Sequence, residues 1–369
     1  MVQPSLYKYQ HYNYPITFIF TMRLIAIALA GALTLAAADK SMACSRVVMI
    51  TDSARIVMVG RTLDWRTPIP TNLYVYPRGV SKESMPRGPR LQWRARYGSV
   101  VAVSYDGGVT EGLNEAGLVM NGLFCNVTQY RTVADTADAD TPVMSLSMIV
   151  SYFLDNFATV AEVEAWLDDN DFAIAGSDFD GGTTTLLHWA LTDAGGETLI
   201  MEYVGGRLTT RRGKQHTVLT NNPIYSDMQA IDAYWGDVGG ENMLPGTVRS
   251  ADRFVRGSYF IGHVPHNVGH SDALASLSAI MGTLSVPWGY TVEGKPHLSS
   301  TQWRSIADAS TSRYYIRFAD SLSDFYIDLN GLPLTSDSPI LKLDTTAHDT
   351  LGGCVNDMLT ESSGFSPIW

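Results

Sequence analysis

Cysteine is scarce in this sequence: three occur in 369 residues, Cys44, Cys125 and Cys354. So low a content excludes a scaffold built on disulfides, and an odd number leaves at least one thiol without an intramolecular partner. The sequence also lacks the G-x-S-x-G turn of serine hydrolases, the Walker loop and the G-x-G-x-x-G dinucleotide fingerprint. Nucleotide chemistry and the α/β-hydrolase mechanism therefore have no support in the sequence.

Basic residues are few as well: 26 lysines and arginines stand against 37 aspartates and glutamates, which gives a formal net charge of −11. Nucleic acids and anionic membranes are bound by basic surfaces, so neither is an expected partner. With 45% hydrophobic and 17% charged residues, the composition is that of a globular protein with a large core. Because no internal repeat or linker is visible, we expect a single domain over residues 44–369.

Near its N-terminus the sequence has the pattern of a secretory signal peptide. Arg23 gives a basic start, residues 24–38 form an apolar run, and Ser41 and Ala43 provide a small-x-small cleavage site. The run is too short for a typical membrane span. We expect residues 1–43, an upstream extension plus the signal, to be removed. The mature protein is then exported, periplasmic or secreted, without stable membrane association.

Cleavage after Ala43 would make Cys44 the first residue. Its α-amine, with an ordinary pKa of about 7.7–8.0, would then act as a base toward its own thiol, a scheme used for amide cleavage. Three other interpretations stay open: a lipid attachment site, a disulfide with Cys125 or Cys354, and an inert buried thiol. Lipid attachment is disfavoured because residues 41–43 lack the apolar residue expected three positions before a lipoprotein cysteine.

A β-hairpin is predicted directly after this cysteine. Residues 46–50 and 56–60 are apolar, strand-forming runs that flank a polar turn. Antiparallel pairing of the two runs would return Arg61 to Cys44, and Asp64 follows three residues later. A guanidinium beside a thiol favours the thiolate, and a nearby carboxylate can hold the α-amine. The alternative is an ordinary surface Arg–Asp pair.

Through six motifs in chain order, the sequence resembles the choloylglycine hydrolase family. This family comprises the penicillin V acylases and bile salt hydrolases, within the N-terminal-nucleophile hydrolases. The motifs are Cys-Ser-Arg at 44–46, Gly-Arg-Thr-Leu-Asp-Trp at 60–65, Gly-Leu-Asn-Glu-Ala-Gly-Leu at 112–118, Thr-Thr-Leu-Leu-His-Trp at 184–189, Leu-Thr-Asn-Asn-Pro at 219–223, and Leu-Pro-Gly at 244–246 running to Arg253 and Phe254. The resemblance extends to about Phe318. It implies an α+β fold, the four-layer αββα sandwich of two antiparallel sheets flanked by helices.

The resemblance also implies site residues and an activity. Cys44 would be the nucleophile, with Arg61 and Asp64 beside it. Asn221 would donate a hydrogen bond to the oxyanion, and Arg253 would complete the polar cluster. The implied reaction is hydrolysis of a small-molecule acyl amide through an acyl-thioester, with no cofactor or metal. The implied assembly is a homo-oligomer, a tetramer in this family.

Two departures from the family pattern affect these expectations. Phe124 stands where many bile salt hydrolases have Asn and penicillin V acylases have Tyr, so a backbone N–H would have to be the second oxyanion donor. The segment between Pro223 and Leu244 is short, whereas Gram-positive bile salt hydrolases carry an assembly loop there. Together with the export signal, this resembles the Gram-negative branch of the family.

We therefore expect penicillin V acylase-like activity. The alternatives on the same site are a bile salt hydrolase and an N-acyl homoserine lactone acylase. The alternative from another class is a non-catalytic exported lipoprotein or binding module. Leu63, Trp65, Tyr105 and Phe124 are candidates for an apolar acyl pocket because they lie near the motifs, although each could equally be an ordinary core residue.

Further elements follow from periodicity and turn signals. We predict helices over 143–157, 159–167 with Thr159 as N-cap, and 273–284; a hairpin over 185–204; and strands over 313–318 and 325–329. Three histidines have metal-like spacing: His263, His266 and His270. Proline and glycine interrupt any helix there, so a polar loop is expected instead of a metal site. His188, in a strand pattern, is expected to be a core histidine and not a base.

Overall fold

The computed structural model describes residues 44–51, 56–135, 140–176, 185–293 and 299–369. The predicted signal segment lies outside these ranges, as do the centre of the first turn and Thr184 of the fourth motif. Residues 42–369 form one compact unit. The removal of residues 1–43 and the organisation of the remainder as a single catalytic domain stay predictions.

The first large sheet has seven strands and contains both strands of the predicted first hairpin. In spatial order these are β14 (Val218–Leu219), β1 (Ser45–Ile50), β2 (Val57–Trp65), β15 (Ser300–Asp308), β16 (Arg313–Phe318), β17 (Phe325–Asp328) and β19 (Gly353–Cys354). All neighbours are antiparallel except β17 and β19, which are parallel. The nucleophile candidate thus lies at the start of a strand that is enclosed on both sides, by β14 and β2.

The second large sheet has nine strands, all antiparallel to their neighbours. In spatial order these are β13 (Arg207–Arg212), β12 (Thr198–Val204), β11 (Leu187–Thr192), β8 (Val119–Phe124), β7 (Gly108–Asn114), β6 (Ser99–Ser104), β3 (Thr71–Tyr76), β18 (Ile340–Leu343) and β20 (Thr360–Ser362). Two small sheets add β4 (Ser81–Glu83) with β5 (Gln92–Arg94) and β9 (Val143–Ser145) with β10 (Ala173–Ala175).

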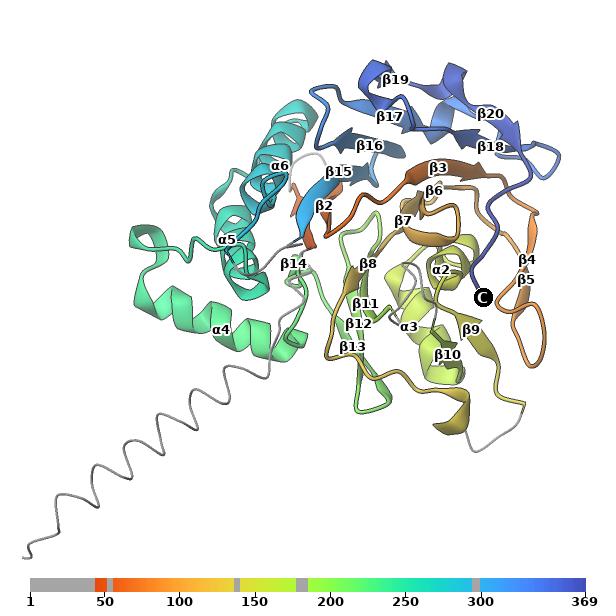
Figure 1. Ribbon diagram of the computed structural model, residues 1–369, viewed down its shortest axis with the longest axis horizontal. Helices are drawn as coiled ribbons and strands as arrows, with labels where there is room; N and C mark the ends of the chain where they lie inside the picture. Colours follow the sequence, from red (N-terminus) through yellow and green to blue (C-terminus); the bar gives the residue numbers. More distant parts are fainter. Residues whose placement is uncertain (1–43, 52–55, 136–139, 177–184, 294–298) are drawn as a thin grey trace, which may run out of the picture. The chain divides into compact units, whose positions relative to one another are not determined.

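Helices cover the outer face of each large sheet (Figure 1). The helices α2 (Ile149–Asn156) and α3 (Val160–Asp169) contact the nine-stranded sheet, α5 (Ser250–His263) and α6 (His270–Leu284) contact the seven-stranded sheet, and α4 (Tyr225–Val238) packs on α5. Short 3₁₀ helices are η1 (Val133–Asp135), η2 (Gly240–Asn242), η3 (Leu329–Gly331), η4 (His348–Thr350) and η5 (Asn356–Met358). Among the described residues, no helix has the length and apolar character needed to cross a membrane.

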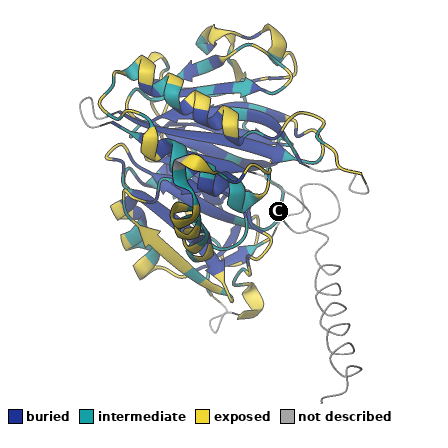
Figure 2. Ribbon diagram, turned by 90° about the vertical axis from the view of Figure 1, so that its left-hand side faces the viewer, coloured by how far each residue is buried: buried dark blue, intermediate teal, exposed yellow. Residues whose placement is uncertain are grey.

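Three apolar clusters hold these layers together. One lies between the sheets and includes Val48, Leu73 and Val100, and the other two join each sheet to its helices. Because side chains alternate along a strand, Val48 of β1 faces the opposite sheet while Met49 faces α5 and α6. Figure 2 shows the strands mostly buried, with exposed residues on the surrounding helices and loops. The predicted four-layer αββα sandwich is confirmed.

Several local predictions are confirmed. The first hairpin forms as expected, but its register pairs Arg61 with Arg46 and not with Cys44, a shift of two residues that keeps the arginine side chain on the expected face. The second hairpin forms from β11 and β12, and α6, β16 and β17 lie where the predicted helix and late strands were placed. Thr159 caps α3 in a capping box with Glu162, whose N–H donates to the threonine hydroxyl at 3.2 Å.

The predicted helix over 143–157 is wrong in its first part. Residues 143–145 form β9, which pairs in parallel with β10, and the helix begins only at Ile149. The backbone N–H of Val143 donates to Pro89 and that of Ser145 donates to Ser84. These long-range hydrogen bonds outweigh the helix preference of the local sequence. The helices α4 and α5 were not predicted.

Candidate active site

Cys44 is buried at the entrance to β1, and the hairpin brings Arg61 to it. The guanidinium Nη2 of Arg61 lies 3.7 Å from the sulfur, and the backbone oxygen of Asp64 lies 3.9 Å from it. Strand β2 continues past the predicted Gly60 to Trp65, which places Arg61 and Asp64 in regular strand geometry. The structure therefore holds a positive charge directly against the thiol.

Asn221 lies just after β14, next to β1. Its Oδ1 accepts from the backbone nitrogen of Cys44 at 2.7 Å and from Arg253 at 2.7 Å, and its Nδ2 donates to the carbonyl oxygen of Phe124 at 2.7 Å. Two donors on one side and an acceptor on the other fix the orientation of the amide. The oxygen thus holds the nitrogen that cleavage would turn into the α-amine, and Nδ2 keeps a second hydrogen that can be donated to an oxyanion.

Arg253, on α5, holds the backbone of the nucleophile. Its Nη1 donates to the Cys44 carbonyl oxygen and to the Ser45 hydroxyl, both at 2.6 Å. Its Nε donates to the carbonyl oxygen of Val248 at 3.0 Å, and the side chain is completely buried. This arginine therefore orients Cys44 and Asn221 together without contacting the sulfur.

Asp64 is also completely buried, and its carboxylate is held by two hydroxyls. Thr301 donates at 2.6 Å and Thr62 at 3.3 Å. Burial raises the pKa of Asp64 to about 6, although Arg253 and the threonine hydroxyls act against this. The nitrogen of Cys44 donates to Asn221, while the Asp64 carboxylate is held by Thr301 and Thr62.

The raised pKa of Asp64 predicts a pH dependence. The group is ionised above about pH 6 and protonated below it. An ionised carboxylate stabilises the ammonium that forms when the α-amine takes the thiol proton. We therefore expect kcat/KM to fall as the pH drops below about 6. Asp64→Asn cannot titrate at this position, so its pH profile should show low activity without the fall near pH 6. If that fall is unchanged in the variant, another group causes it.

Glu111, on β7, is a buried site residue that the sequence did not reveal. Its carboxylate accepts from Arg61 Nη1 at 2.8 Å, the Tyr314 hydroxyl at 2.6 Å, Asn121 Nδ2 at 3.0 Å and the Ser305 hydroxyl. The partners come from strands of both sheets. Glu111 thus fixes the guanidinium that faces the thiol. The only signal available was a charged residue inside an apolar strand, just before the 112–118 motif.

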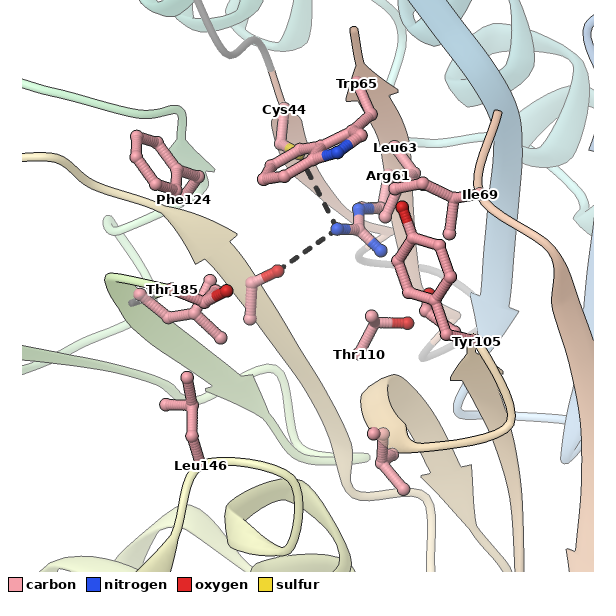
Figure 3. Close-up of a pocket in the computed structure, with 15 residues that line it drawn as sticks. Cys44, Arg61, Leu63, Trp65, Ile69, Tyr105, Thr110, Phe124, Leu146 and Thr185 are labelled. Atoms are coloured by element: carbon pink, nitrogen blue, oxygen red, sulfur yellow. Dashed lines mark hydrogen bonds between the residues drawn. The ribbon is translucent and has the colours of Figure 1, made fainter. Parts of the chain in front are cut away.

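An apolar pocket of about 590 Å³, including its open mouth, lies beside Cys44 (Figure 3). All four predicted residues line it, namely Leu63, Trp65, Tyr105 and Phe124. The rings of Trp65 and Phe124 meet edge to face with centroids 6.0 Å apart. Sequence reasoning missed the contributions of other segments, namely Ile69, Val109, Leu146, Thr185 and Leu187. The apolar lining suits an acyl group next to the thiol.

The remaining candidates lie away from the sulfur. His188 is buried, with its ring nitrogens 3.0 Å from Glu202 and 2.7 Å from the Thr220 carbonyl oxygen, so it supports the segment that carries Asn221. Each histidine of the metal-like trio has separate partners: Tyr259 for His263, Ile50 and Ile261 for His266, and Asp308 for His270. No cluster of metal-ligating side chains occurs in the described ranges. All three cysteines are unpaired, which removes the disulfide alternative for Cys44.

Replacing Asn221 by alanine tests its role. The variant loses the acceptor that holds the Cys44 nitrogen, and it loses Nδ2, the candidate oxyanion donor. We expect kcat to fall by roughly 10²–10³-fold, the usual loss for one oxyanion donor, with a smaller change in KM. Steady-state kinetics measures both constants. An unchanged kcat would remove Asn221 from the oxyanion site.

Comparison with known proteins identifies the class. The chain belongs to the choloylglycine hydrolase family, described as "Linear amide C-N hydrolases, choloylglycine hydrolase family", which matches residues 44–342. Penicillin V acylase of Pectobacterium atrosepticum is 33% identical over 333 residues, or 85% of this chain and 86% of the relative. Bile salt hydrolase/transferase of Bifidobacterium longum is 24% identical over 314 residues, or 77% of this chain and 97% of the relative.

Solved structures agree with this assignment. Penicillin V acylase from Agrobacterium tumefaciens superposes with a TM-score of 0.80 at 35% identity, covering 88% of this chain and 99% of that chain. Conjugated bile acid hydrolase from Clostridium perfringens superposes with a TM-score of 0.66 at 18% identity, covering 81% and 96%, and shares the fold. The predicted family, and its resemblance to the Gram-negative penicillin V acylases, are confirmed.

Proposed function

We propose that the protein is a penicillin V acylase-like amidohydrolase that removes an apolar acyl group from an amine through Cys44. One observation carries this proposal. Asn221 holds the nitrogen of Cys44, the sulfur of Cys44 faces Arg61, and Cys44 and Arg61 line an apolar pocket. Nucleophile, base, oxyanion donor and acyl site are thereby brought within one cluster.

The reaction follows from this arrangement. The α-amine of mature Cys44 takes the thiol proton, the sulfur bonds to the amide carbonyl carbon, and Asn221 Nδ2 donates to the oxyanion. Because Phe124 has no polar side-chain group, the second donor is a backbone N–H. Breakage of the C–N bond releases the amine, which takes the proton from the α-ammonium. Water then hydrolyses the thioester, releasing the carboxylic acid and restoring the thiol.

Two alternatives use the same bond chemistry: hydrolysis of conjugated bile acids and of N-acyl homoserine lactones. The pocket is apolar, and penicillin V acylase activity is favoured because the relatives with that name are 33% and 35% identical to this chain, against 24% for the bile salt enzyme. A lipoprotein function is disfavoured. It requires a lipid on the Cys44 sulfur, which is buried and lies 3.7 Å from the guanidinium of Arg61.

A substrate panel tests the proposal. The purified mature protein is offered penicillin V, glycine- and taurine-conjugated cholic acid, and N-acyl homoserine lactones, with Cys44→Ser as the blank. We expect the highest kcat/KM on penicillin V. Dominant turnover of a bile conjugate or a homoserine lactone would replace the proposed substrate. No turnover of any amide by a protein with a free Cys44 amine would contradict amidase function.

We also propose that the mature protein is exported and forms a homo-oligomer. The short segment between Pro223 and Leu244 contains α4, which exposes the side chains of Tyr234 (61%) and Val238 (44%). Such apolar exposure on an outer helix suits contact with a second copy. Light scattering of the purified protein gives the assembly size directly, and cell fractionation gives its compartment.

A further inference from the structure

One wall of the acyl pocket is formed by the turn that joins β6 to β7. Five pocket-lining residues lie on or beside this turn: Ser104, Tyr105, Gly108, Val109 and Thr110. Figure 3 shows the ring of Tyr105 between Ile69 and Thr110. The conformation of the turn therefore determines the position of this wall and the width of the pocket.

The turn is held in a conformation that its residues disfavour. The N–H of Gly107 donates to the Ser104 carbonyl oxygen at 3.0 Å, and the two residues between them, Tyr105 and Asp106, have φ of 56° and 48°. Hairpin turns of this kind normally carry Asn and Gly, because a Cβ crowds the backbone at positive φ. A tyrosine stays there only when surrounding contacts hold it.

Asp106 is the first anchor of the turn. Its Oδ1 accepts from Asn72 Nδ2 at 2.9 Å and from the Tyr74 hydroxyl at 3.1 Å, and its Oδ2 accepts from Lys342 Nζ at 2.9 Å. These donors come from β3 and β18, neighbouring strands of the nine-stranded sheet. The carboxylate thus ties the turn to the sheet on the side away from Cys44's strand.

Ile368 is the second anchor. Its N–H donates to the Gly107 carbonyl oxygen at 2.9 Å, and its own carbonyl oxygen accepts from the Ser147 hydroxyl at 2.8 Å and from the Ser145 hydroxyl at 3.2 Å. The two serines flank Leu146, another pocket-lining residue. A Cβ on Gly107 would lie 2.5 Å from Ile368 Cδ1, so glycine permits this close contact. In Figure 1 the segment after β20 runs past β6 and β7 toward α2.

We propose that Asp106 and Ile368 are positioning residues that set the size of the acyl pocket, and hence which acyl chain lengths the enzyme accepts. Neither residue lines the pocket. They act through Tyr105 and Leu146, which do. The inference rests on the proposed amidase function, because it assigns the pocket to the acyl group.

The test compares two variants with wild type on linear amides of one amine, from acetyl to decanoyl. Ile368→Pro removes the N–H that donates to Gly107, and Asp106→Ala removes the carboxylate that accepts from Asn72, Tyr74 and Lys342. Releasing the wall enlarges the pocket, so we expect the ratio of kcat/KM for the longest to the shortest chain to rise at least about fivefold. Ile368→Val keeps the N–H and should keep the wild-type ratio. Leu332→Ala, which removes a half-buried aliphatic side chain elsewhere, serves as the stability-matched control and should keep that ratio.

A second readout separates this inference from the proposed function. Cys44 is alkylated with bromomethyl ketones of the same chain lengths, relative to iodoacetamide, and intact mass follows the label. If the wild-type protein is alkylated but cleaves no amide, the amidase proposal is contradicted. The dependence of alkylation on chain length still measures the effect of the pocket wall. Identical chain-length profiles in wild type, Ile368→Pro and Asp106→Ala would overturn the inference. Should Ile368→Pro fail to fold, Asp106→Ala decides the same question.

Discussion

Replacing Cys44 by serine is expected to lower kcat by at least about 10³-fold while the protein stays folded. The hydroxyl is a far weaker acid than the thiol, and the guanidinium of Arg61 lies 3.7 Å from the sulfur, a distance suited to sulfur and too long for a hydrogen bond to oxygen. The contacts of Arg253 and Asn221 with the backbone of residue 44 are kept. Steady-state kinetics measures the loss, and circular dichroism with thermal unfolding measures the fold.

Cys354→Ser is the matched control for this substitution. It makes the same chemical change at an exposed thiol remote from the pocket lining. We expect its kcat/KM to stay within about twofold of wild type. Substantial turnover by Cys44→Ser, or an equal loss in Cys354→Ser, would contradict the assignment of Cys44 as the nucleophile.

Replacing Glu111 by alanine is expected to lower the free energy of unfolding by about 3–5 kcal/mol. The carboxylate neutralises Arg61 between the sheets, and its removal leaves that buried cation without its counter-ion and the Tyr314 hydroxyl without its acceptor. Glu111→Gln keeps one acceptor oxygen and should be less harmful. Urea unfolding of both variants gives the free energies, and their kcat shows how far Arg61 depends on this support.

The control for Glu111 is an ion pair at the surface. Glu83 pairs with Arg90 at 2.9 Å, with about a third of each side chain exposed. Glu83→Ala should cost less than about 1 kcal/mol, because water replaces such a pair cheaply. A Glu111→Ala variant as stable as Glu83→Ala would show that the buried network contributes little to the fold.

Local sequence chemistry predicts those parts of the fold whose partners are close in the chain. The first hairpin follows from two apolar runs around a polar turn. It pairs Arg61 with Arg46, two residues from Cys44, and the long arginine side chain reaches the sulfur. Thr159 and Glu162 lie three residues apart, so the local sequence is enough to predict the capping box. The family resemblance adds Asn221 and Arg253, which no local argument connects with Cys44.

The remaining features depend on residues distant in sequence. Glu111 is fixed by donors from β2, β8, β15 and β16, and no spacing in the sequence relates these strands. Residues 143–145 have helix-compatible periodicity, yet pairing with β10 makes them a strand. The apolar pocket beside Cys44 draws Ile69, Leu146 and Leu187 from three further segments. Long-range pairing and pocket shape therefore became visible only with the structure.

The central claim is that Cys44 becomes an N-terminal nucleophile with a free α-amine. The intact mass of the purified exported protein, with its first residue identified, tests this most directly. We predict a chain that begins at Cys44 and carries no added mass. A chain that begins upstream of Cys44, or one with a lipid on its amine, would contradict the claim, because the base required by the mechanism would then be blocked.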